Sequence, residues 1–124
     1  MEMRLPEDFE YLVRAVAGVR DQSYAAYVGI AAVILNRTAD ARYPDTAAGV
    51  IGAGELLPLP GEAVISEREY RVVYDACAAA YMGADPTGGA LSFSVEYDGE
   101  GSEYPGLPDV VIGGTAFWRG WSLE

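Results

Sequence analysis

The chain of 124 residues contains no histidine, no lysine and only one cysteine. Without histidine it cannot build a Ser-His-Asp triad or a histidine-containing zinc site, and one cysteine cannot form an internal disulfide. Hydrolytic chemistry would therefore depend on carboxylates, hydroxyls or arginine. The single cysteine, Cys77, lies in the alanine-rich stretch YDACAAAYMG, where we expect a small buried packing residue. No cofactor or metal ion is expected.

Positive charge is also scarce, because the formal net charge is −11 and the arginines are scattered. Nucleic-acid binding needs clustered basic side chains, so it is not expected. No apolar run approaches the ~20 residues that span a bilayer. The N-terminus, MEMRLPEDFE, has acids where a signal peptide has a basic start and an apolar block. We expect the chain as given to be cytoplasmic, or cell-wall or spore associated if a leader has been removed.

Helical patterns fill the first two thirds of a chain whose length fits one domain over residues 1–124. Residues 6–20 have apolar side chains at helical spacing and predict an amphipathic helix. Residues 28–35, VGIAAVIL, are apolar on every side and predict a buried central helix that has Ser23 as its N-cap. A short helix is predicted near residues 46–51.

A third long helix is predicted over residues 66–83, where Ser66 and Glu69 have capping-box spacing. The following stretch, ALSFSVEY at residues 90–97, alternates apolar and polar positions and predicts a strand. A second apolar run, residues 110–121, is interrupted by two glycines. The expected fold class is α+β and mainly α, with helices around a buried central helix and a small antiparallel β region that has a long or bulged connection.

Four segments in this order resemble the SleB-type cell-wall hydrolases, the family that includes spore-cortex-lytic enzymes. They are AAVILNR at residues 31–37, RYPDTAAGVI at 42–51, DPTGGALSF at 85–93 and VIGGTAFW at 111–118. The resemblance implies a lysozyme-like fold. It also implies cleavage of peptidoglycan by a lytic transglycosylase mechanism, in the muramic-acid-lactam-containing cortex for some members.

Such a reaction needs a glutamic acid in a partly dry cleft to protonate the glycosidic oxygen. The C6 hydroxyl of the substrate then closes onto C1, so a second carboxylate is dispensable. The resemblance places this acid at the end of the first helix, in a pattern close to Ala-Glu-Ala-x-Gly-Glu upstream of Asn-Arg. Counting back from Asn36 and Arg37, Gly18 falls on the catalytic position and Gln22 on the second glutamate.

Glycine has no proton to donate, and the amide of Gln22 can bind a sugar but does not ionise. Loss of a general acid lowers a rate by ~10²- to 10⁴-fold. Other positions depart from the family pattern in the same way. The family has Gln-Phe where this chain has Glu55 and Leu56, an aromatic and asparagine pattern where it has residues 94–97, and histidine where it has Thr115.

Three carboxylates could replace the missing acid. Glu55 is the best candidate because it lies in an otherwise apolar loop, GAGELLPLP. Asp21 is expected to be a solvated or capping residue of the polar turn, and Glu96 an edge-strand surface acid.

Aromatic side chains could stack on sugar rings, although we expect most of them to fill the core or the hairpin. The set is Tyr24, Tyr27, Tyr43, Tyr97, Tyr104, Trp118 and Trp121. Tyr97 and Tyr104 are the ones we assign to a cleft, because they flank a polar loop. With Gln22 and Glu55 they form the predicted substrate-binding set.

Three functions stay open at this point. The first is a catalytically impaired SleB-like homologue that binds peptidoglycan or a protein partner in a sporulation or cell-envelope context. The second is an active hydrolase or lytic transglycosylase with a relocated acid, Glu55. The third is a protein-interaction module without a glycan site.

Overall fold

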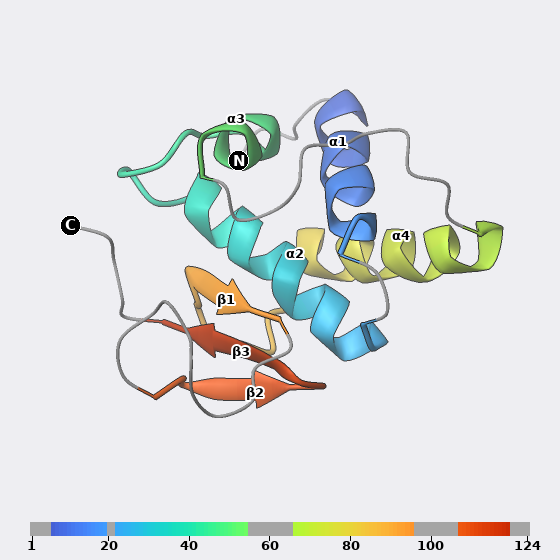
Figure 1. The fold of residues 1–124 in the computed structure, drawn as a ribbon. Coiled ribbons are helices and arrows are strands. Elements are labelled where there is room, and N and C mark those ends of the chain that lie inside the picture. The colour runs from blue at the N-terminus through green and yellow to red at the C-terminus, as the bar shows by residue number, and fades with distance from the viewer. Residues whose placement is uncertain (1–5, 20–21, 55–65, 96–106, 120–124) are drawn as a thin grey trace.

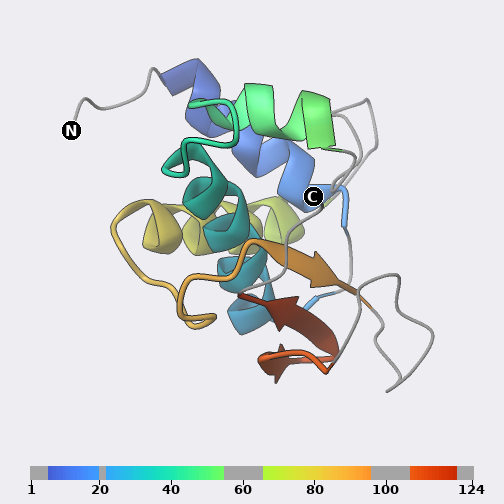
Figure 2. The ribbon, with the colours of Figure 1, turned by 90° about the vertical axis from the view of Figure 1, so that its left-hand side faces the viewer.

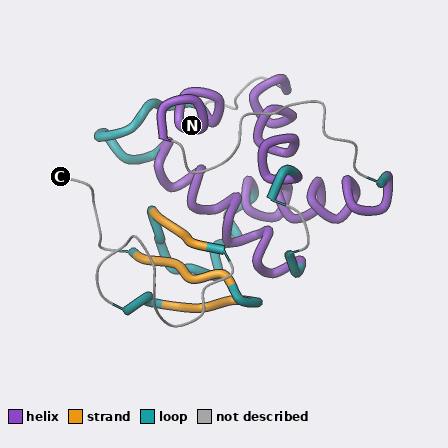
Figure 3. Tube along the Cα trace, in the orientation of Figure 1, coloured by secondary structure: helices purple, strands orange, loops and turns teal. Residues whose placement is uncertain are grey.

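The computed structural model describes residues 6–19, 22–54, 66–95 and 107–119. Helices precede strands along the chain, as the colours of Figure 1 show, and Figure 3 distinguishes the helices from the strands. The elements are α1 (Pro6–Ala17), α2 (Tyr24–Thr38), α3 (Ala47–Gly54), α4 (Glu67–Tyr81), β1 (Ser92–Ser94), β2 (Val110–Ile112) and β3 (Thr115–Trp118). The expected mainly α architecture with a small antiparallel sheet is confirmed.

The central element is α2, which contacts α1, α3 and α4 and packs against the sheet. Figures 1 and 2 show the sheet on one side of α2 and helices α1 and α3 on the other. The apolar run predicted to be buried is buried from Ala26 to Ile34. Ser23 caps α2 as expected, because its hydroxyl accepts a hydrogen bond from the backbone N–H of Ala26 at 3.1 Å.

The first helix is shorter than predicted, since α1 ends at Ala17 and not near residue 20. Its last turn tightens: the N–H of Gly18 donates to the carbonyl of Ala15 at 3.1 Å, and the N–H of Val19 to that of Val16 at 3.0 Å. Such i→i+3 bonds are typical of a helix end. Gly18 therefore ends α1 instead of lying inside it.

Helices α1 and α3 are joined by a side chain that the sequence patterns do not single out. The two carboxylate oxygens of Asp8 each accept a hydrogen bond at 3.0 Å, from the N–H groups of Ala47 and Ala48. These are unpaired donors at the start of α3, where a negative charge is favourable. Asp8 thereby fixes how α3 packs on α1.

Among the described residues the β region contains three strands, and their order is β1-β3-β2. Both pairs are antiparallel, with Phe93 opposite Phe117 in one pair and Val111 opposite Ala116 in the other. The predicted second run is thus a hairpin of two strands. Gly113 and Gly114 have φ angles of 58° and 85°, which a two-residue type I′ turn requires.

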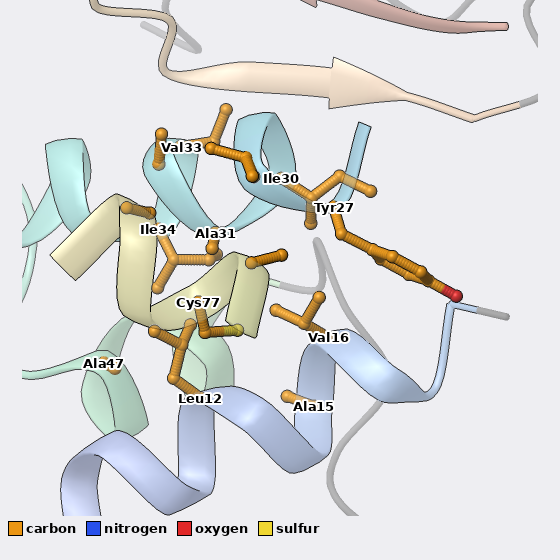
Figure 4. Close-up of a cluster of buried hydrophobic side chains, with 14 of the residues drawn as sticks. Leu12, Ala15, Val16, Tyr27, Ile30, Ala31, Val33, Ile34, Ala47 and Cys77 are labelled. Carbon is orange, nitrogen blue, oxygen red and sulfur yellow. The ribbon is translucent and has the colours of Figure 1, made fainter. Parts of the chain in front are cut away.

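The core lies where α1, α2 and α4 meet, and Figure 4 shows part of it. Cys77 has no exposed surface and packs among aliphatic side chains such as Leu12 and Val16, so the expected packing role is confirmed. Burial raises the pKa of its thiol to about 12. Cys77 is therefore held as a neutral thiol.

Candidate functional site

Gly18 lies at the exposed end of α1, at the start of the turn that leads into α2. It offers only backbone groups to a ligand, and its N–H is already used by Ala15. A proton donor at this position would need a side chain that the residue lacks. The structure thus places the sequence-predicted position at the junction of two helices, without chemistry of its own.

Gln22 ties this turn to the sheet. Its side-chain oxygen accepts a hydrogen bond from the hydroxyl of Thr115 at 2.9 Å, although the two residues are 93 positions apart. Thr115 is completely buried in β3. The structure therefore joins two positions at which the sequence comparison predicts a departure from the SleB-type pattern.

Tyr27 ties the same turn to α4. The backbone N–H of Gln22 donates to the Tyr27 hydroxyl at 3.3 Å, and this hydroxyl donates to the carboxylate of Glu69 at 2.5 Å. Figure 4 shows the Tyr27 ring extending from α2 at the edge of the buried cluster. Gln22 is thus linked to both neighbouring elements through hydrogen bonds.

Glu69 is a carboxylate near the turn that sequence reasoning did not assign to the site. The capping hydrogen bond that its spacing from Ser66 predicts is present, because the Glu69 N–H donates to the Ser66 hydroxyl at 3.0 Å. Its side chain, however, contacts Tyr27, which lies 42 residues earlier. No local pattern could have indicated this contact. In this contact the Glu69 oxygen accepts the hydrogen bond from the Tyr27 hydroxyl.

The residues behind the family resemblance hold the scaffold together. The carboxylate of Asp85 accepts hydrogen bonds from the Asn36 amide at 3.1 Å, the Thr87 hydroxyl at 2.5 Å and the Gly89 N–H at 2.9 Å. Partial burial acts to raise the pKa of Asp85, but the hydrogen bonds from Thr87, Asn36 and Gly89 outweigh it and lower the pKa below its ordinary value.

Arg37 is buried beside the DPTGG turn, residues 85–89. Its guanidinium donates to the carbonyl of Leu91 at 2.7 Å and lies 4.6 Å from the ring centre of Tyr43. A buried guanidinium needs such partners. The Asn-Arg pair at the end of α2 and the DPTGG turn therefore form one structural unit that positions β1.

The remaining sequence-predicted site residues are only partly covered by the structure. Glu55, Tyr97 and Tyr104 lie outside the described residues, as do Asp21 and Glu96. Among the aromatic candidates that are described, Tyr27 and Trp118 are buried, as expected for core residues. Tyr24, the first residue of α2, is 49% exposed and adjoins the turn.

A pocket of about 390 Å³ lies at the other ends of the same helices. Its walls include Asp8 and Phe9 of α1, Leu35 of α2 and Tyr81 of α4. Gly18 and Gln22 follow the end of α1 and precede α2, so the pocket is separate from the turn that they form. It adds nothing to the chemistry of that turn.

The described part of the chain contains no group of three or more Asp, Glu, Cys or His side chains placed to hold a metal ion. None of its helices combines the length and apolar character needed to cross a membrane.

The sequence is similar to a known protein family and to individual members of it. The family described as Cell Wall Hydrolase matches residues 21–106. Spore cortex-lytic enzymes of Bacillus cereus and Oceanobacillus iheyensis are each 34% identical to this chain over 87 residues, or 69% of its length. The alignments cover 34% and 32% of those enzymes, so the chain spans about a third of the curated relatives it matches.

Solved structures of SleB catalytic domains resemble this chain over nearly its whole length. The catalytic domain of the Bacillus cereus SleB protein has a TM-score of 0.72 and 28% identity, covering 96% of this chain and 94% of that one. The catalytic domain of the germination-specific lytic transglycosylase SleB from Bacillus anthracis has a TM-score of 0.67 and 28% identity, covering 96% and 99%. These domains are lysozyme-like, which confirms the expected fold. The chain therefore belongs to the cell wall hydrolase family, as a SleB-type member.

Proposed function

We propose that this chain binds peptidoglycan through a SleB-like cleft and cleaves it much more slowly than its relatives, or not at all. The observation that carries the proposal is Gly18, an exposed residue without a side chain at the end of α1. Counting from the Asn36-Arg37 pair aligns this position with the family's catalytic glutamate. The likeness to SleB catalytic domains, which covers 96% of the chain, supports the comparison with the family pattern.

The chemistry explains why one residue matters so much. A glycosidic oxygen leaves readily only when it is protonated, and a lytic transglycosylase uses one carboxylic acid for that step. Gln22 cannot replace it, because an amide neither donates nor accepts a proton in this range. A sole general acid contributes ~10²- to 10⁴-fold in rate, so its loss leaves binding as the main property of the cleft.

The first test compares binding with cleavage. Purified peptidoglycan sacculi are incubated with the protein and, as a positive control, with the Bacillus cereus SleB catalytic domain. We expect this chain to sediment with the sacculi while releasing muropeptides at least ~10²-fold more slowly than the control. Release at a comparable rate would overturn the proposal. Failure to sediment would favour the third function, a module that binds a cell-envelope protein.

A relocated acid remains the second candidate function. Glu55 stays a prediction because it lies outside the described residues, whereas Glu69 is seen beside the turn through its contact with Tyr27. If Glu55 is the proton donor, Glu55→Gln will abolish muropeptide release. If Glu69 is the proton donor, Glu69→Gln will do so. If both variants behave as the unmodified protein does, neither carboxylate carries residual cleavage. A role in sporulation is part of the first proposed function, and the similarity to spore cortex-lytic enzymes supports it.

A further inference from the structure

The pocket of about 390 Å³ lies where the first residues of α1 and α3 meet the last residues of α2 and α4. This volume is in the range of small-molecule sites. Much of the lining is apolar, because it includes Leu12 of α1, Leu35 of α2 and Ala80 of α4. The pocket can therefore take an apolar group of a ligand out of water.

Two carboxylates line the same pocket at the start of α3, those of Asp8 and Asp45. An oxygen of Asp8 lies 3.0 Å from the backbone nitrogen of Ala47. Asp45 precedes Ala47 by two residues, so the Cα atoms of these two residues are no more than about 7 Å apart. The acidic groups are thus gathered at one side of the pocket, next to α3.

Negative charge exceeds positive charge at this side. The start of a helix carries about half a positive charge, whereas two ionised carboxylates carry two negative charges. Among the residues that the structure describes, the lining contains no arginine, and the chain has no lysine or histidine. The net charge of −11 adds a long-range attraction for cations. The pocket is therefore complementary to a positively charged ligand.

Asp8 can accept a further hydrogen bond without releasing α3. An ionised carboxylate has about four acceptor positions, and each Asp8 oxygen accepts one hydrogen bond, from Ala47 or Ala48. Two aromatic rings also line the pocket: Phe9 and Tyr81 meet edge to face, with ring centres 5.6 Å apart. Aromatic rings attract ammonium groups and pack well against apolar ones.

We propose that this pocket binds a small organic amine that carries an apolar group. The ammonium group donates to the Asp8 carboxylate beside α3, and Asp45 adds its negative charge. The apolar group lies against Leu12, Leu35 and Ala80. The site is independent of the proposed peptidoglycan binding, since no residue of the turn between α1 and α2 lines it.

The probes are three molecules of similar size: phenethylamine, phenethyl alcohol and hydrocinnamate, which are cationic, neutral and anionic. Binding is followed by two-dimensional NMR, with the backbone signals of Ala39, Ala47 and Ala80 as reporters of the pocket. We expect phenethylamine to shift these signals, the alcohol to bind more weakly and hydrocinnamate to cause no shift. Absence of a shift with the amine, equal shifts with all three probes, or amine shifts spread over the acidic surface would overturn the proposal.

A matched pair of variants tests the charge of the pocket. Asp45→Asn keeps the shape and removes one negative charge, and we expect ~2- to 5-fold weaker amine binding. Asp75→Asn is the control, because Asp75 is an exposed acid of α4 outside the lining, and its affinity should be unchanged. Unchanged affinity in Asp45→Asn, or an equal loss in both variants, would overturn the selection by charge.

Two further measurements address Asp8. Asp8→Asn should weaken amine binding at least as much as Asp45→Asn does, and thermal unfolding without ligand shows whether α3 has loosened. Because this variant could fail to fold, the unmodified protein is also titrated at about 0.1 M and about 1 M salt. The higher salt should weaken binding of the amine and not of the alcohol, since it screens charge. An amine affinity that does not change with salt would overturn the proposal.

Discussion

The amide of Asn36 donates to the carboxylate of Asp85 at 3.1 Å and so joins the end of α2 to the turn before β1 across 49 residues of sequence. The attachment of β1 to α2 therefore depends on the charge of the Asp85 carboxyl group. Asp85 also receives hydrogen bonds from Thr87 and Gly89, which are strongest when the carboxylate is ionised. Its protonation should therefore weaken the attachment of β1 to α2.

The first prediction concerns acid stability. Because the pKa of Asp85 is lower in the folded protein, its contribution is fully present above the unfolded value of about 3.9 and is lost as the pH falls through the folded value. The free energy of unfolding, measured with urea, should decrease from pH 5 to pH 2.5. Asp85→Asn should be less stable at pH 7 and lose less on acidification. An equal loss in the variant would show that other groups cause the decrease.

The second prediction compares two helical glycines. A Cβ atom at Gly29 would lie 2.7 Å from a ring carbon of Phe117, which is fully buried. Gly29→Ala should therefore destabilise the protein by ~1–3 kcal/mol through overpacking, despite the better helix propensity of alanine. At Gly52 no atom of the described residues outside its own helix lies within 4 Å of the same position, and the residue is exposed, so Gly52→Ala should stabilise by up to ~1 kcal/mol. Thermal unfolding of both variants checks the opposite signs.

The third prediction uses the buried thiol. Burial raises the pKa of Cys77 to about 12, so almost no thiolate exists at pH 8. A thiol reagent should modify Cys77 only when the protein unfolds, and the labelling rate should increase with denaturant along the unfolding transition. Fast stoichiometric labelling without denaturant would contradict the burial of this residue.

The fourth prediction concerns the missing acid. Gly18→Glu places a carboxyl group at the position that we align with the family's catalytic glutamate, and we expect muropeptide release to rise by up to ~10²- to 10⁴-fold if the rest of the cleft is intact. Gly52→Glu is the control, since it adds the same side chain at an exposed glycine of α3. A rise in both variants would mean that the added charge, and not its position, is responsible.

Local sequence was sufficient for the helical part of the fold. The apolar run in α2, the capping hydroxyls of Ser23 and Ser66 and the burial of Cys77 all follow from neighbouring residues, and the structure confirms them. The end of α1 was misplaced because residues beyond Ala17 are still compatible with a helix. The double glycine was read as an interruption of one run, although positive φ angles make it a hairpin turn.

The contacts of the site could not be predicted in the same way. Gln22 meets Thr115 at a separation of 93 residues, and Tyr27 meets Glu69 at a separation of 42. Such pairs depend on how helices and sheet pack, and no periodicity or spacing encodes them. The assignment of Gly18 and Gln22 to the family's catalytic pattern comes from comparison with a known sequence pattern, and it stays a prediction.

The strand order has a consequence for synthesis of the protein. Among the described residues, β1 and β2 pair only with β3, and β3 is the last strand to be translated. A nascent chain that ends before Thr115 already contains all four helices but exposes two strands without a hydrogen-bonding neighbour. The sheet that faces α2 can therefore assemble only after β3 has been translated, and a chain interrupted before Thr115 would leave aggregation-prone strand edges.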